Sequence, residues 1–144
     1  MQTIKRQGFF TRVLSGLLLC AGLVLSQASS AHAQTNCNGS SGCGGREGNV
    51  ASDLANFIIA NVNPNQQFVD TQQIACKSVK RGFICAFLQR TGTGATGQEI
   101  KNAVQNIPNH KCRVCGSTTV KAGELTFNFT THGCKAQDGL FTCS

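Results

Sequence analysis

The sequence contains neither tryptophan nor tyrosine, and acidic residues and histidines are scarce. Without the two larger aromatic residues, a stacking platform for bases or sugars would have to consist of the nine phenylalanines alone. The six acidic residues and three histidines are scattered along the chain and reveal neither a catalytic triad nor a pair of carboxylates. We therefore expect that the protein is not an enzyme and that it does not bind nucleic acid.

A hydrophobic run long enough to span a membrane is also missing. The stretch Val13–Leu25 consists of 13 apolar or small residues, whereas a membrane-spanning helix needs about 20. Basic residues precede this stretch and Ala31-His32-Ala33 follows it, which is the pattern of a secretory signal with its cleavage site. We expect residues 1–33, including Cys20, to be a removed signal peptide, the alternative being a membrane anchor. Residues 34–144 are then expected to form one secreted, extracellular domain.

Eight of the nine cysteines lie within residues 34–144. In the oxidising environment of a secreted protein they predict four disulfide bonds, each worth about 2–4 kcal/mol. A domain of this length has a modest core, so these crosslinks would supply part of its stability. The same residues carry ten lysines and arginines against six acidic residues, which gives a net charge of +4. This charge favours anionic partners such as cell walls, membrane surfaces or the acidic mouths of cation channels.

The pattern of apolar and turn residues predicts a mixed α and β domain. Residues 36–49 are rich in glycine, serine and asparagine and are expected to be irregular. Apolar residues at helical spacing then predict a helix over about residues 50–62. The segments 72–79 and 83–90 are rich in β-branched and aromatic residues, and they predict a hairpin that turns at Lys80-Arg81-Gly82.

The second half of the chain has its own start and stop signals. A second helix is expected to begin at the capping box Thr96-Gly-Gln-Glu99 and to end at Pro108. The alternating run Glu124–Thr130 predicts the clearest strand. Asp138-Gly139 is the pair typical of a type I′ hairpin turn. Together the elements predict an α+β fold, a disulfide-rich two-layer α/β sandwich of an antiparallel sheet with two main helices packed on it.

Counting register from the two turns narrows the 105 pairings that eight cysteines allow. A two-residue turn at Asp138-Gly139 would place Cys134 opposite Cys143 at a non-hydrogen-bonded site, where a disulfide fits best. The same count about Lys80-Arg81 places Cys76 opposite Cys85. If either hairpin has another loop length, Cys76 or Cys85 would bridge to Cys134 or Cys143 instead, so both possibilities stay open.

The four remaining cysteines are six positions apart near the N-terminus and three positions apart after the second helix. These offsets suit two parallel bridges, Cys37 with Cys112 and Cys43 with Cys115. The four could also form a zinc site, but the oxidising compartment favours disulfides, and no metal is expected. Gly92–Gly97 matches G-x-G-x-x-G but lacks the carboxylate that a dinucleotide site needs about 20 residues later. We interpret it as a loop before a capped helix.

Three segments carry a resemblance to a known family. They are Asn36-Cys-Asn-Gly-Ser-Ser-Gly-Cys-Gly44, Asn109-His-Lys-Cys-Arg-Val-Cys-Gly-Ser117, and Ala122-Gly-Glu-Leu-Thr-Phe-Asn-Phe129 with Cys134 beyond it. Together they resemble the fungal killer protein 4 family over residues 36–134. The resemblance implies a compact α/β sandwich that is secreted and active without a cofactor. It also implies inhibition of sensitive cells by blocking calcium uptake through cation channels.

The partner that this resemblance implies is a membrane calcium channel of a competing or host cell, bound through basic surface residues of a monomeric toxin. The candidates are Lys77, Lys80, Arg81, Lys111, Arg113 and Lys121. The chain departs from the family prototype because it has fewer cysteines, adds Cys85 and a tail ending in Cys143, and has Ile74 where the prototype has a lysine. The alternative function is therefore a secreted effector or cell-wall-binding module of the same fold without channel activity.

Two sequons, Asn38-Gly-Ser40 and Asn128-Phe-Thr130, are possible N-glycosylation sites in a eukaryotic host. The second lies within a predicted strand, where a glycan is disfavoured.

Overall fold

The computed structural model describes residues 33–44 and 48–143. The predicted signal peptide, apart from its last residue, lies outside the described residues. Among those residues, no helix combines the length and the apolar character that crossing a membrane requires.

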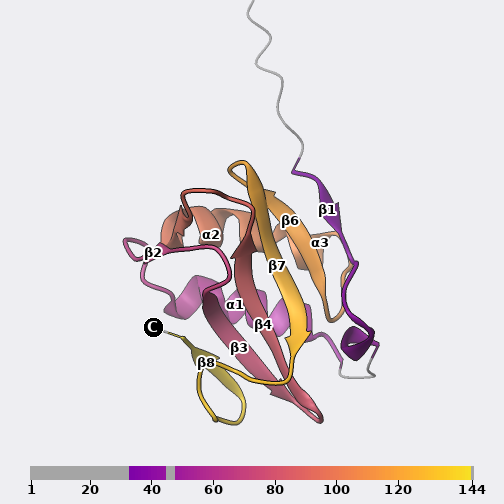
Figure 1. Ribbon diagram of the computed structural model, residues 1–144. Helices are drawn as coiled ribbons and strands as arrows, with labels where there is room; N and C mark the ends of the chain where they lie inside the picture. The colour runs from indigo at the N-terminus through magenta and orange to yellow at the C-terminus, as the bar shows by residue number, and fades with distance from the viewer. Residues whose placement is uncertain (1–32, 45–47, 144) are drawn as a thin grey trace, which may run out of the picture. The chain divides into compact units, whose positions relative to one another are not determined.

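Six strands form an antiparallel sheet in the order β1-β6-β7-β4-β3-β8 (Figure 1). Strand β4 lies inside the sheet between β3 and β7, which fits its nearly continuous apolar sequence Gly-Phe-Ile-Cys-Ala-Phe-Leu-Gln. Two further strands, β2 and β5, form a separate two-stranded ladder. The bounds are β1 Thr35–Asn36, β2 Gln67–Phe68, β3 Gln73–Val79, β4 Gly82–Gln89, β5 Ala95–Thr96, β6 Gly116–Val120, β7 Gly123–Thr130 and β8 Leu140–Thr142.

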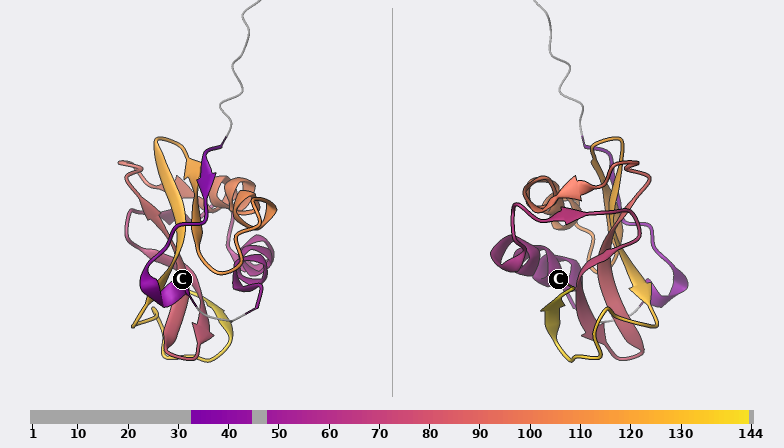
Figure 2. Two further views of the ribbon diagram at one scale, coloured as in Figure 1. Left: turned by 90° about the vertical axis from the view of Figure 1, so that its right-hand side faces the viewer. Right: turned by 60° about the vertical axis from the view of Figure 1, so that its left-hand side comes forward.

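The helices cover one face of the six-stranded sheet (Figure 2). They are α1 Val50–Asn61, α2 Gly97–Val104 and the single turn α3 Asn106–Asn109, and a short 3₁₀ helix, η1, spans Ser41–Cys43. Helix α2 begins with the predicted capping box, in which the Thr96 hydroxyl accepts from the backbone N–H of Glu99 and the Glu99 carboxylate accepts from that of Thr96. The predicted α+β fold, with an antiparallel sheet and two main helices, is confirmed.

The main core lies between the helices and this face of the sheet. Helix α1 buries Leu54 and Ile58 at the spacing that its sequence predicts. From the sheet, Leu88, Leu125 and Phe127 are fully buried against the helices. The alternation of β7 therefore places its apolar side chains toward the helices, as expected.

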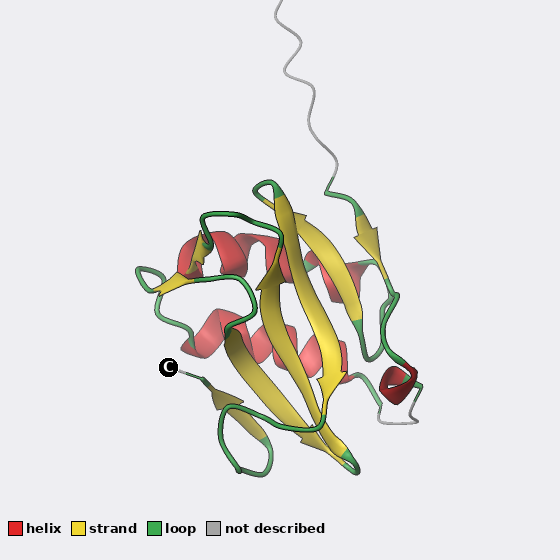
Figure 3. Cartoon of the chain, viewed as in Figure 1, coloured by secondary structure: helices red, strands yellow, loops and turns green. Residues whose placement is uncertain are grey.

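A second, smaller cluster lies on the opposite face of the sheet. It contains Cys76, Cys85 and Phe141, with Phe83 packed edge-to-face on Phe141 at a ring-centroid distance of 5.9 Å. The loop between β7 and β8 crosses this face (Figure 3), and the backbone carbonyl of His132 in that loop accepts a hydrogen bond from the Gln73 side chain at 3.0 Å. The C-terminal segment thus closes a second core over strands β3 and β4.

Four disulfide bonds tie these parts together. They join Cys37 to Cys112, Cys43 to Cys115, Cys76 to Cys85 and Cys134 to Cys143. The first two are the parallel bridges that the cysteine offsets suit, and the last two are the local pairs, one of the two possibilities that the register count left open. Cys76 and Cys85 face each other across the β3–β4 hairpin as the register count predicts.

Two local predictions are wrong. Residues 134–137 form no strand, and β8 pairs with the edge of β3 instead, while Asp138 lacks the positive φ that a type I′ turn requires. Helix α2 ends at Val104, and Pro108 lies within α3. A proline is tolerated there because the first turn of a helix needs no backbone donor from it.

Candidate functional site

The turn between β3 and β4 presents two basic side chains at one end of the sheet. Val79 pairs with Gly82, so that Lys80 and Arg81 alone form the turn, and both are exposed. Gly82 has φ +155° and lies so close to the Thr130 carbonyl that a Cβ atom would collide with it. This close approach of the backbones fixes the turn against the end of β7.

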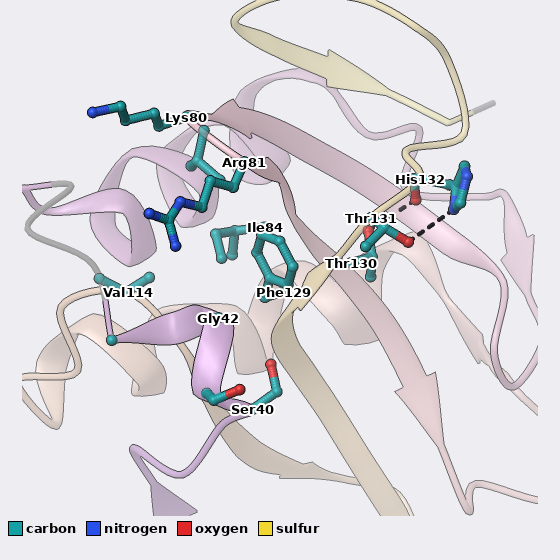
Figure 4. Close-up of a pocket in the computed structure, with 13 residues that line it drawn as sticks. Ser40, Gly42, Lys80, Arg81, Ile84, Val114, Phe129, Thr130, Thr131 and His132 are labelled. Carbon is teal, nitrogen blue, oxygen red and sulfur yellow. Dashed lines mark hydrogen bonds between the residues drawn. The ribbon is translucent and has the colours of Figure 1, made fainter.

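A hollow of about 1280 Å³ opens beside this turn, on the side of η1. Its floor is apolar and consists of Val79, Ile84, Val114 and Phe129. Lys80 and Arg81 stand at its rim, and its remaining walls are small or polar: Ser40, Ser41, Gly42, Gly44, Thr130, Thr131 and His132. In Figure 4, Ile84 and Phe129 lie side by side at the centre, while the Arg81 side chain extends toward Val114.

The wall that η1 forms is fixed by contacts with β7. The backbone N–H of Ser40 donates to the Asn128 side chain at 2.9 Å, and Gly42 lies directly on the Phe129 ring, where a Cβ atom would collide. The Cys43–Cys115 disulfide holds the end of η1 against the start of β6. On the far wall, the Thr131 hydroxyl and His132 Nδ1 are hydrogen-bonded at 2.9 Å. The hollow is therefore largely preformed.

A second hollow of about 220 Å³ lies next to the first, because Val114 lines both. Lys111 and Arg113 line it together with the four cysteines of the two N-terminal bridges. Both basic residues are exposed. We call Lys80, Arg81, Lys111 and Arg113 the basic end. Within residues 33–44 and 48–143, none of these four forms an ion pair.

The other two candidate basic residues are placed elsewhere. The ammonium of Lys77 contacts the Asp53 carboxylate of α1 at 2.5 Å, and Lys121 contacts Glu99 at 3.2 Å. Lys121 lies at the turn between β6 and β7, outside both hollows. The structure thus brings four of the six predicted residues together, and their role in binding stays a prediction.

Two arrangements in the described part of the chain have the composition of ligand sites, a group of cysteines and a glycine-rich loop. The sulfur atoms of Cys76, Cys134 and Cys143 lie within 4.8 Å of one another, but all three are in disulfides and offer no thiolate. The loop at Gly92 is closed by Asp70, which accepts hydrogen bonds from the hydroxyl and backbone N–H of Thr91 and from the N–H of Gly92. This supports the interpretation of the glycine-rich motif as a structural loop.

The two sequons differ in accessibility. Asn38 is exposed, whereas the Asn128 side chain is half-buried and accepts hydrogen bonds from the backbone N–H groups of Ser40 and Phe129. A glycan on the Asn128 Nδ2 would have to fit beside the half-buried contact between β7 and η1. Asn38 is the better acceptor.

The floor of the larger hollow was not identified from the sequence. The alternation of β7 predicts that Phe129 shares a face with Leu125 and Phe127, but it does not predict that the core ends there. Phe129 and Val79 remain half-buried, whereas Phe127 is fully buried. The only signal was their position at the ends of strands, one or two residues from a turn.

Comparison with known proteins identifies the scaffold. The model of the Kp4 family matches residues 19–131, more than half of the chain. The chain belongs to the Kp4 family. This Kp4 protein is 31% identical over 107 residues to the KP4 killer toxin of Ustilago maydis P4 virus, an alignment that covers 65% of this chain and 77% of the viral protein.

Family membership makes this Kp4 protein killer-toxin-like. The homology and the four disulfides are consistent with a secreted protein. The family match includes η1, the β3–β4 turn and most of both hollows, but it ends at residue 131. The Cys134–Cys143 bridge and β8 therefore lie beyond the matched part of the family.

Proposed function

We propose that this Kp4 protein is secreted and inhibits the growth of competing or host cells by blocking calcium uptake through a cation channel, using the basic end. The observation that carries the proposal is the gathering of four exposed cations, without ion pairs in the described residues, around two adjoining hollows of a killer-toxin scaffold. The proposed mechanism is occlusion of the channel or a change in its gating, without chemistry.

Electrostatics favours such a partner. Cation channels attract their ions with rings of acidic side chains, and a patch of one charge speeds association with a patch of the opposite charge. Lys80 and Arg81 lie at the tip of a hairpin, so a concave or flat partner can reach them without displacing other elements. Because these charges are exposed, the attraction should weaken as ionic strength rises.

Growth inhibition with and without added calcium tests this function. Purified protein should slow growth of a sensitive fungal or plant culture, and millimolar calcium should restore growth, because the block acts on uptake. A potassium salt at equal ionic strength controls for screening of the charges. Inhibition that calcium does not relieve would contradict the proposal. Retention on cell-wall polysaccharide, with no inhibition, would favour the alternative effector or wall-binding function.

Reversing the charge of single basic residues tests whether the basic end is the surface that inhibits growth. Lys80→Glu or Arg81→Glu should weaken inhibition by about tenfold or more, as expected for charges that steer association. Lys101→Glu on α2 makes the same change of charge outside both hollows and serves as the matched control. Equal loss in all three variants would mean that net charge, not this surface, carries the activity.

A further inference from the structure

The hollow beside η1 combines two features that one simple ligand would not satisfy. Ile84 and Val114 in its floor belong to the main core and have exposed fractions of only 1% and 9%. Phe129 and Val79 extend this apolar floor toward the surface. An apolar floor that opens to solvent stabilises the complex when another apolar group covers it, because apolar area is then removed from water.

The rim of the same hollow is cationic. Lys80 and Arg81 are exposed, and no acidic residue is among its described lining residues. Arg81 extends over the hollow, whereas Lys80 points outward at its edge (Figure 4). A free anion would leave the floor in contact with water, and a purely apolar ligand would leave both cations without partners. The site instead fits a ligand that is apolar at its centre and anionic at its margin.

We propose that this hollow is a receptor for one bulky apolar side chain of an acidic segment of the target protein. The proposal rests on the proposed function, and it names the part of the target that the toxin holds. A volume of about 1280 Å³ is sufficient for a large aromatic side chain together with the adjoining backbone. Buried aromatic anchors surrounded by a polar rim are the usual source of affinity in protein interfaces.

The walls are fixed before binding, which lowers the entropic cost of association. The Ser40 N–H bond to Asn128, the contact of Gly42 with Phe129 and the Cys43–Cys115 bridge hold η1 in place. Serine and threonine hydroxyls on the walls, including Ser40 and Thr131, can pair with the backbone of an inserted segment.

Binding of short peptides tests the chemistry directly. The protein has no tryptophan or tyrosine, so the emission of a single tryptophan in a peptide reports only on that residue. An acetylated and amidated Asp-Glu-Trp-Glu-Asp peptide should show a saturable blue shift as its indole leaves water. A Ser-Ser-Trp-Ser-Ser peptide should bind at least about tenfold more weakly. Asp-Glu-Ala-Glu-Asp, used as a competitor, should fail to displace the first peptide.

A substitution that fills the hollow provides the second arm. Gly44 lines the hollow with φ −74°, and among the atoms of the described residues a Cβ atom there would meet only the Ser41 carbonyl, at an ordinary 3.4 Å. Gly44→Phe should therefore be tolerated and should weaken peptide binding at least about tenfold, whereas Gly44→Ala, the matched control, should bind as the natural protein does. Far-UV circular dichroism and the mass of the four-disulfide form verify the fold of both variants.

Peptide binding that is unchanged in a folded Gly44→Phe variant, or equal for the three peptides, would overturn the inference. Calcium-current recordings separate it from the proposed function. If the natural protein blocks the current and Gly44→Phe blocks it equally well, the hollow does not hold the channel, and the inference fails while the function stands. If the natural protein does not block the current, the proposed function fails, and the peptide arm alone decides the chemistry of the site.

Discussion

Removing one of the two N-terminal disulfides should cost much less stability than removing both. Cys37–Cys112 and Cys43–Cys115 close loops of 75 and 72 residues. Their ends are only six and three positions apart. In a chain that already holds one of the two bridges, adding the other closes a ring of about nine residues and contributes about 2.6 kcal/mol of chain entropy. In a chain that holds neither bridge, adding one closes the long loop and contributes about 4.4 kcal/mol.

The free energies of unfolding should therefore be non-additive. Cys37→Ala with Cys112→Ala, or Cys43→Ala with Cys115→Ala, should each lower stability by about 2.6 kcal/mol, and the variant lacking both bridges by about 7 kcal/mol. The latter value is comparable with the whole stability of an ordinary domain, about 5–15 kcal/mol, so this variant should be largely unfolded. Urea titrations followed by far-UV circular dichroism measure these differences. A loss of about 4.4 kcal/mol for each single removal, adding in the double removal, would refute the reasoning.

Three further measurements address other parts of the structure. The Thr91 hydroxyl lowers the pKa of Asp70 below 3.8 and the Thr96 N–H lowers that of Glu99 below 4.5. Both carboxylates thus stabilise the fold above these values and lose this contribution as the pH falls through their lowered pKa values. In the double variant Asp70→Asn with Glu99→Gln, Tm should therefore fall less steeply as the pH is lowered into the acid range. Mild reduction followed by alkylation should open Cys134–Cys143 first, because only this bridge has no buried residue, and earlier labelling of another pair would contradict this order. Phe127→Ala should lower the free energy of unfolding by about 3–5 kcal/mol in urea titrations, since the side chain is fully buried, and a loss under about 1 kcal/mol would contradict its place in the core.

Local patterns predicted the features that depend on neighbouring residues. The capping box at Thr96 and Glu99 lies within one helical turn, so the sequence alone contains both partners. The alternation of Leu125 and Phe127 follows from the two-residue repeat of a strand. The Cys76–Cys85 pair follows from the two-residue turn of its own hairpin.

Features that depend on distant parts of the chain could not be predicted in this way. Strand β8 pairs with β3, more than 60 positions away in sequence, and the local Asp138-Gly139 signal gave no indication of this choice. The register of β3 shifts between Gln73 and Ala75, which leaves Ile74 and Ala75 both fully buried. No residue type marks that bulge in the sequence.

In the candidate site, too, the local features could be predicted from the sequence and the long-range ones could not. Lys80 and Arg81 were predicted together because they share a turn. The hollow beside them exists only because η1 forms its wall. The position of η1 is fixed by Asn128 and by the Cys43–Cys115 bridge, and both Asn128 and Cys115 are more than 70 positions away from η1 in the sequence. Lys121 shares only the charge of Lys80 and Arg81, because it lies at the turn between β6 and β7, outside both hollows, and pairs with Glu99 there.

Calcium-current recording from sensitive cells is the most direct test of the basic end as a channel-blocking surface. Micromolar natural protein should reduce the current, Lys80→Glu should weaken the block by about tenfold or more, and Lys101→Glu should block as the natural protein does. The block should also weaken when ionic strength is raised, because the four cations of the basic end are exposed. An unchanged current in the presence of the natural protein, or an equal block by both variants, would contradict the account.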